Sequence, residues 1–155
     1  MDNEQGFIQS IVVELENEEY AIPVEFIGGI ERIQQITRVP KTTSFIKGVI
    51  NLRGVITPII DLRERFGLSP KEHNDSTRII IAEMESFNVG FIVDAAYDVV
   101  NIPNEAIEPN PKVIGTKDID YIDGVAKVGN RLLMLLNLER TLSHDNYQIE
   151  RDQDD

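Results

Sequence analysis

The side chains that could carry out chemistry are few in this chain, and they do not gather at catalytic spacing. The sequence holds two histidines, His73 and His144, and no cysteine, so it offers no thiolate and no cluster of zinc ligands. Both histidines lie in polar segments without a paired acid nearby. We therefore predict no metal site and no nucleophile activated by histidine.

Two acids deserve separate consideration as a general acid and base. Asp94 and Asp98 are close in sequence, but they flank a predicted turn, where aspartate commonly accepts hydrogen bonds from free backbone N–H groups. Asp61 similarly resembles the N-cap of a short helix. No glycine pattern is typical of a phosphate-binding loop, so we predict no cofactor and no enzyme activity. An active site assembled from residues distant in sequence stays an alternative.

The charge of the chain limits its partners. A formal net charge of −12 disfavours nucleic acids and anionic membrane surfaces, which attract lysine and arginine. The first residues are acidic where a signal peptide would be basic, and no apolar run is long enough for a spanning helix. We expect a cytoplasmic protein with no nucleic-acid binding and no direct membrane insertion, whose partners are proteins.

The elements that position these residues are organised around a predicted hairpin at 45–62. Residues 47–52 and 55–61 are rich in β-branched side chains, and Arg53-Gly54 between them is typical of a two-residue reversal. Pro58 lacks a backbone donor, so the returning strand should be an edge strand or carry a bulge there.

The hairpin recurs without a gap at 121–138. Gly48 aligns with Gly124, and the turn Arg53-Gly54 aligns with Gly129-Asn130, which suits a primed turn. If the two turns are alike, Arg53 has a positive φ that costs on the order of 1 kcal/mol, which would make it a functional candidate. A different turn or a bulge that suits arginine is equally consistent with the sequence.

A weaker match places 20–33 along 89–102, with Glu25 opposite Asp94 and Ile30 opposite Val99. Together the two matches indicate a duplicated unit of about 70 residues. The remaining pattern predicts strands at 7–15, 20–22, 30–39, 78–83 and 89–93, the third of them after a break at Gly28-Gly29. It also predicts helical turns at 23–26, 62–67 and 137–142, and a surface connection at 103–120.

A duplicated β unit must cover its apolar face by closing on itself or by packing on its twin. We therefore predict a mainly β fold of two five-stranded barrels with a groove between them. One domain should span 1–144, with halves at roughly 18–76 and 77–138 and possible strand exchange between them. An acidic flexible tail is expected at 145–155.

The stretch 45–62 closely resembles the signature of the CheW coupling proteins of bacterial chemotaxis, and the resemblance continues through 18–22, 90–94 and 132–139. It implies two intertwined five-stranded barrels with short helices and a C-terminal helix. It also implies a non-enzymatic adaptor that links the cytoplasmic tip of chemoreceptors to the regulatory domain of the histidine kinase CheA. Such an adaptor would be monomeric when free, recruited to membrane-associated receptor clusters, and able to join rings in receptor arrays.

The resemblance also implies contact residues, in two sets. Candidates for receptor contact are Ile27, Ile30, Gly48, Arg53 and Val99. Candidates for contact with the kinase or with another copy are Ile107, Glu108, Pro109, Lys112 and Val113. The chain departs from the family at Gly29, where many members have glutamate, and at Glu108, where some have a basic residue. The alternative function is a regulatory or small-ligand-binding β-barrel domain that uses the groove.

Overall fold

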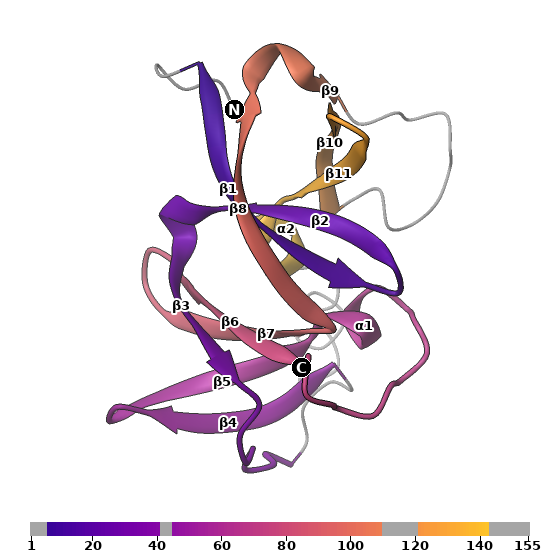
Figure 1. Cartoon of the computed structure of the whole chain (residues 1–155). Helices are drawn as coiled ribbons and strands as arrows, with labels where there is room; N and C mark the ends of the chain where they lie inside the picture. The colour runs from indigo at the N-terminus through magenta and orange to yellow at the C-terminus, as the bar shows by residue number, and fades with distance from the viewer. Residues whose placement is uncertain (1–5, 41–44, 110–120, 143–155) are drawn as a thin grey trace, which may run out of the picture.

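The structure, a computed structural model, describes residues 6–40, 45–109 and 121–142. These residues form mostly strands, as predicted (Figure 1). The strands are β1 (Phe7–Leu15), β2 (Glu18–Pro23), β3 (Ile27–Arg32), β4 (Ile46–Leu52), β5 (Val55–Asp61), β6 (Arg78–Glu83), β7 (Asn88–Val93), β8 (Ala95–Pro103), β9 (Ile107–Pro109), β10 (Ile122–Val128) and β11 (Arg131–Leu136). The helical elements are the 3₁₀ turns η1 (Val24–Phe26) and η2 (Asn104–Ala106) and the short helices α1 (Leu62–Arg65) and α2 (Leu138–Leu142).

The strands form two sheets, which occupy the upper and lower parts of Figure 1. One has six strands in the order β8-β1-β2-β11-β10-β9, and the other has five in the order β3-β6-β7-β5-β4. The six-stranded sheet contains strands from both ends of the chain, because β1 and β2 join the second hairpin. The five-stranded sheet is built from the middle of the chain, where β6 and β7 join the first hairpin. The chain therefore crosses between the sheets twice, after β2 and after β7.

The two sheets have the same internal register, which supports the predicted duplication. Ile59 of β5 pairs with Gly90 of β7 in parallel, and Leu135 of β11, which aligns with Ile59, pairs in the same way with Ala21 of β2. The outer strands β3 and β8 are likewise equivalent partners of β6 and β1. A duplicated β unit has thus exchanged its first two strands between the copies.

Three apolar clusters explain why the central strands are almost continuously hydrophobic. Side chains alternate between the two faces of a strand, so both faces of these strands must be buried. On one face, each sheet packs around its own cluster. On the other, both sheets and both helices contribute to a shared core. The shared core includes Val13, Tyr20, Ile60, Phe66, Ile80, Phe91 and Leu138. The six-stranded sheet has its own cluster with Val12, Ala21, Ile102, Ala126, Leu133 and Leu135, and the five-stranded sheet one with Ile50, Ile59, Ile79, Ile81 and Ile92.

Two aligned glycines let an outer segment pack against each hairpin. A Cβ on Gly48 would lie 2.1 Å from the carbonyl oxygen of Thr37, and one on Gly124 would lie 2.5 Å from that of Glu108. Thr37 forms an isolated bridge with Val49, with backbone N···O distances of 2.9 and 2.8 Å. Glycine is required at both positions because no side chain fits between these backbones.

The predicted strand at 30–39 is wrong in its bounds. β3 runs from Ile27 to Arg32, straight through Gly28-Gly29. A register shift between Ile27 and Gly29 opposite β6 shows that the glycines form a bulge within the strand and do not end it. Beyond Arg32, Thr37 alone forms a bridge within this segment.

The predicted connection at 103–120 also contains structure that the sequence pattern missed. Residues 104–106 form η2, and residues 107–109 form β9, which pairs with β10 and adds a sixth strand to that sheet. Pro109 can occupy this strand because β9 is an edge strand. Residues 110–120 and the predicted tail at 145–155 lie outside the described residues.

β5 is not an edge strand, since it lies between β4 and β7, but among the described residues Pro58 itself pairs only with β4. It lies opposite Val49 of β4, while the pairing of β5 with β7 begins one residue later, at Ile59. One side of the backbone at Pro58 thus has no strand partner, as the missing donor requires. Within the part of the chain that the structure describes, no helix is long and apolar enough to cross a membrane.

Candidate functional site

The turn between β4 and β5 is strained at an arginine. Arg53 has a φ of 52° and Gly54 a φ of 88°, so both central residues of the turn are left-handed. Asn51 Oδ1 accepts a hydrogen bond from the Gly54 backbone nitrogen at 2.8 Å and holds the turn closed. Of the two readings that the sequence left open, the positive φ at Arg53 is therefore confirmed.

The Arg53 side chain is held only loosely. It is 70% exposed, and its Nη1 lies 3.5 Å from Oε2 of Glu31 on β3. An exposed pair at this distance contributes little to stability, so the guanidinium can exchange Glu31 for another carboxylate. The neighbour of Glu31 on β3, Ile30, is 45% exposed, and two residues at the start of β5, Val55 and Ile56, are exposed by 50% and 62%. A cation thus projects beside exposed apolar side chains, and we call Ile30, Arg53, Val55 and Ile56 the first-hairpin surface.

Two of the equivalent positions on the other sheet are apolar as well, but the arginine there, Arg131 at the place of Val55, is fully paired. Val99 on β8, equivalent to Ile30, is 53% exposed, and Leu132 on β11, equivalent to Ile56, is 61% exposed. Arg131 contacts Asp98 at 3.1 Å and Glu19 at 3.2 Å. The hydrogen bonds that Arg131 donates to Asp98 lower the pKa of Asp98, and its donation to Asp98 and Glu19 raises the pKa of Arg131.

The five residues predicted for receptor contact divide into two groups. Ile30, Arg53 and Val99 are exposed, on the turn or on outer strands. Ile27 is half-buried against the shared core, and Gly48 is buried beneath the backbone of Thr37. The ion pair between Arg53 and Glu31 connects the turn with the strand that carries Ile30, whereas Val99 lies on the other sheet.

The residues predicted for kinase contact lie partly on β9. Ile107 is half-buried against the cluster of the six-stranded sheet, while Glu108 and Pro109 are exposed. Lys112 and Val113 lie outside the described residues. The exposed part of this set is therefore a short edge strand, on the opposite side of its sheet from β8.

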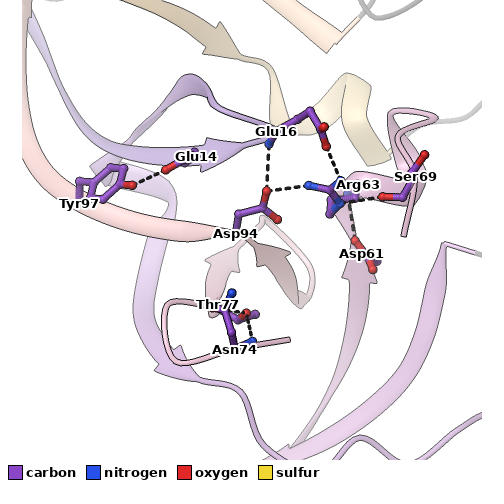
Figure 2. Close-up of polar contacts among 9 residues, drawn as sticks. All are labelled: Glu14, Glu16, Asp61, Arg63, Ser69, Asn74, Thr77, Asp94 and Tyr97. Carbon is purple, nitrogen blue, oxygen red and sulfur yellow. Dashed lines mark hydrogen bonds and ion pairs between the residues drawn. The ribbon is translucent and has the colours of Figure 1, made fainter. Parts of the chain in front are cut away.

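An ionic cluster that sequence reasoning missed joins the two halves of the chain (Figure 2). Arg63 of α1 is 8% exposed, its Nη1 donates to Asp94 Oδ2 at 2.7 Å, and its Nη2 contacts Glu16. Its Nε donates to the carbonyl oxygen of Ser69 at 2.8 Å. Burial disfavours the charged guanidinium, but Glu16 and Asp94 outweigh it and raise the pKa of Arg63. Arg63 therefore closes the junction between α1 and the β1–β2 turn.

The Asp94–Asp98 couple considered from the sequence is instead two separate structural acids. Asp94 Oδ2 accepts from the Glu16 backbone nitrogen at 2.9 Å as well as from Arg63. Asp98 pairs with Arg131. Asp61 caps α1, because its side chain accepts a hydrogen bond from the backbone nitrogen of Arg63 at 2.9 Å. Burial raises the pKa of Asp61. His73 is exposed in its loop, and His144 lies outside the described residues.

A second arginine of α1 holds the starts of the two hairpins together. The Arg65 guanidinium carbon lies 4.9 Å from the ring centre of Phe45 and 4.6 Å from that of Tyr121, the residue aligned with Phe45. Arg65 also donates to the Tyr121 hydroxyl at 2.6 Å and to the Thr141 carbonyl oxygen at 2.7 Å. Such cation–π contacts are favourable when desolvated, and Arg65 is itself buried. Arg65 is thus a structural clamp.

A hollow of about 310 Å³ opens where the two sheets meet. Its walls come from β1, η1, the end of β6, and the junction of β11 with α2. Apolar side chains form much of the lining, and acids complete it. The lining includes Ile8, Glu25, Phe26, Met84, Asp123, Leu136 and Glu139. Across the described ranges, no group of three or more histidines and acids is placed to hold a metal ion.

The family model described as a CheW-like domain matches residues 9–146. The chain belongs to this family. It is 43% identical over 139 residues to chemotaxis protein CheW of Bacillus subtilis (strain 168), covering 89% of this chain and 88% of that protein. It is 38% identical over 135 residues to chemotaxis protein CheW of Klebsiella aerogenes, covering 87% and 81%.

The fold of this CheW-like chain also matches a crystal structure described as that of the scaffolding protein TtCheW from Thermoanaerobacter tengcongensis. The TM-score is 0.83 at 33% identity, and the match covers 90% of this chain and 94% of the other. The predicted fold class and family are confirmed. The CheW-like fold thus presents exposed apolar side chains on both sheets, with a loosely held cation on one of them.

Proposed function

We propose that the chain is a non-catalytic adaptor that couples chemoreceptors to the histidine kinase CheA in bacterial chemotaxis. Membership of the CheW-like family is the observation that carries this proposal. The titratable groups support it, because Arg63, Asp94, Asp98 and Arg131 are paired with one another or with nearby acids. An adaptor needs surfaces for two partners, and the chain offers two separate ones.

The receptor is proposed to bind at the first-hairpin surface. Chemoreceptor tips are helical, and a helix can place an apolar face against Ile30, Val55 and Ile56. A receptor carboxylate would then replace Glu31 as the partner of Arg53, through a charge-assisted hydrogen bond that fixes the orientation of the helix. Val99, the equivalent of Ile30 on the other sheet, extends the proposed contact. Gly48 supports this surface from below without touching the receptor, since no side chain fits there.

The kinase is proposed to bind at β9 and the residues that follow it. Glu108 and Pro109 are exposed on this edge strand, and free strand edges are common docking sites for other proteins. Because the first-hairpin surface lies on the five-stranded sheet, and β9 is the edge of the other sheet opposite Val99 on β8, we propose that kinase and receptor bind together. Residues Lys112 and Val113 belong to the same proposal. Localisation at membrane-associated receptor clusters, and ring formation in arrays, follow from binding both partners at once.

Two charge reversals test the assignment of surfaces. Binding of the chain to a receptor signalling-tip fragment and to the CheA regulatory domain is measured by isothermal titration calorimetry. We expect Arg53→Glu to weaken receptor binding at least about tenfold and to leave kinase binding unchanged, because it reverses one charge–charge contact. We expect Glu108→Arg to weaken kinase binding at least about tenfold and to leave receptor binding unchanged. Lys71→Glu, an exposed loop change of the same charge as Arg53→Glu, is the control.

The outcomes separate clearly. If Arg53→Glu leaves receptor affinity unchanged, the first-hairpin surface is not the receptor site. If the unaltered chain binds neither fragment, the adaptor function itself fails. Melting temperatures of all variants are measured alongside, because a variant that unfolds would lose both partners together.

A further inference from the structure

The two short helices begin at equivalent positions but meet very different surroundings. The alignment of the hairpins places Arg63 of α1 opposite Glu139 of α2, and the second internal match places Asp94 opposite Glu25. Beside the five-stranded sheet, Arg63 and Asp94 are joined by a contact of 2.7 Å. Beside the six-stranded sheet, both equivalent positions hold glutamate, and Glu25 and Glu139 both line the hollow of about 310 Å³.

The equivalence of these positions rests on contacts as well as on alignment. Lys47 Nζ contacts Glu64 Oε2 at 2.7 Å in the first copy. The aligned residues Asp123 and Arg140 make the same pair at 2.7 Å in the second, with the charges reversed. Each helix therefore presents corresponding side chains to its hairpin in the same way. The difference between Arg63 and Glu139 is thus a change of residue at one preserved place in the fold.

The six-stranded sheet consequently has carboxylates beside it where the five-stranded sheet has a complete ion pair. Asp123 is satisfied by Arg140 and by Asn137 Nδ2, at 2.7 and 3.0 Å. No hydrogen bond or ion pair to another described residue is made by the side chains of Glu25 and Glu139. Both are exposed and line the hollow, to which Phe26 and Leu136 contribute apolar lining. The hollow combines exposed carboxylates with apolar side chains.

We infer that this hollow is a docking site for an arginine side chain of a partner protein, which takes the place that Arg63 fills in the first copy. Guanidinium is favoured over ammonium because its planar fork can bond two carboxylates at once, and its methylene stem can lie against the apolar lining. The volume lies at the small end of ligand pockets, roughly 300–1,000 Å³, which suits one or two side chains. The net charge of −12 also favours a basic partner.

This docking site goes beyond the adaptor function and does not depend on it. The hollow is lined by none of the residues proposed for receptor or kinase contact. A partner segment with a basic residue next to an apolar one fits the hollow, since the apolar neighbour would cover Phe26 and Leu136. The partner segment is therefore expected to contain an arginine flanked by leucine-like residues.

A methionine beside the hollow provides a direct probe. The chain has three methionines, of which Met84 lines the hollow and Met134 lies on β11, packed against the shared core. Protein labelled with ¹³C at the methionine methyl groups is titrated with acetyl-Leu-Arg-Leu-amide and followed by NMR. We expect the Met84 signal to move saturably, with a dissociation constant on the order of millimolar, and the Met134 signal to stay in place. The same peptide with glutamine for arginine should bind at least about tenfold more weakly, and added salt should weaken the arginine peptide.

Two variants at one position sharpen the test. Glu139→Arg supplies the missing cation from the chain itself, so we expect it to pair with Glu25 and to reduce peptide affinity at least about tenfold. Glu139→Gln removes a carboxylate without filling the hollow, and we expect a smaller loss, about threefold. Glu105→Arg, an exposed change of the same charge on η2, should bind the peptide as the unaltered chain does.

Several results would overturn the inference. It fails if the Met84 signal does not move, if the glutamine peptide moves it with equal affinity, or if Glu139→Arg retains full binding. It also fails if spermidine moves the signal with the affinity of the arginine peptide, since the hollow would then be a general cation site. Because no receptor or kinase is present, each result is independent of the adaptor function.

Discussion

The tips of the two hairpins occupy equivalent places but are built from different residues. The first tip holds Arg53 and Gly54 at φ values of 52° and 88°, whereas the second has Gly129 at 63°, followed by Asn130. Glycine adopts a positive φ without strain, and arginine does not. The first tip therefore keeps a residue that costs stability and projects a charge, while the second keeps the residue that the turn prefers.

The residues that the two copies share have structural roles. Gly48 and Gly124 are identical because each lies against the backbone of an outer segment. Asp61 and Asn137 both cap a helix, with side-chain oxygens that accept from backbone nitrogens at 2.9 and 2.8 Å. These positions, where the copies agree, thus serve folding, whereas Arg53, where they differ, is free to serve binding. Arg63 and Glu139 extend the contrast, because only the first is paired within the fold.

The largest effect is expected where one copy has a buried ion pair and the other a hollow. Arg63→Met leaves the Asp94 carboxylate, which is 9% exposed, without its cation, and should lower the free energy of unfolding by about 3–5 kcal/mol. Glu139→Met at the equivalent position should change it by less than about 0.5 kcal/mol, since Glu139 is exposed. Urea denaturation measures both. Equal losses would remove the contrast between the copies.

The aligned glycines should respond alike. A methyl group on Gly48 or Gly124 collides with a backbone carbonyl, so each alanine variant should lose about 2–4 kcal/mol. Gly54→Ala, which has a positive φ but nothing within 4 Å of the added methyl, should lose about 1 kcal/mol. Thermal unfolding of the three variants makes the comparison. A Gly48→Ala protein that keeps its stability but loses receptor binding would assign Gly48 to the contact surface.

Copying the second tip onto the first should stabilise the chain. Arg53→Gly relieves the positive φ and sacrifices only an exposed pair at 3.5 Å, so we expect a gain in unfolding free energy of up to about 1 kcal/mol. The reciprocal change, Gly129→Arg, should cost a similar amount. Chemical denaturation midpoints are sufficient to detect both signs. A loss of stability in Arg53→Gly would mean that Arg53 contributes to the fold.

The smallest effect concerns a hydrogen bond near the second tip. The Tyr97 hydroxyl donates to Glu14, and this hydrogen bond raises the pKa of Tyr97 above its ordinary value of 10.0. The raised pKa means that the folded state favours the neutral phenol. The contribution of this hydrogen bond to the free energy of unfolding is therefore complete below about pH 10 and is lost as the pH rises through the folded pKa. Absorbance titration of the tyrosines should show this late ionisation, and Glu14→Gln should bring it forward. An unchanged titration in Glu14→Gln would show that the hydrogen bond is not formed in solution.

Much of the fold could be predicted because the local signals agree with one another. The β-branched runs, the two-residue turns and the gapless repeat all indicate hairpins, and β4, β5, β10 and β11 are present. β9 was missed because prolines at 103 and 109 mark a connection, although proline is tolerated on an edge strand. The bounds of β3 were wrong because a Gly-Gly pair can be a bulge as well as a break.

The ionic cluster could not be predicted in the same way. Arg63 meets Glu16 and Asp94, which lie far away in sequence, and Glu16 belongs to a stretch of acids that is typical of a solvated turn. One signal did exist. The alignment of the copies places an arginine opposite a glutamate at 63 and 139, and a charge reversal at aligned helix positions indicates that the surroundings have changed. Pairing across the fold, however, only becomes visible once the strands are placed.

The central claim is that binding resides where the copies differ. The most direct test is the affinity of a chemoreceptor signalling-tip fragment for the unaltered chain and for Arg53→Gly, the variant whose first tip resembles the second. We predict that the affinity falls at least about tenfold while the melting temperature stays the same or rises. An unchanged affinity at an unchanged or higher melting temperature would contradict the claim.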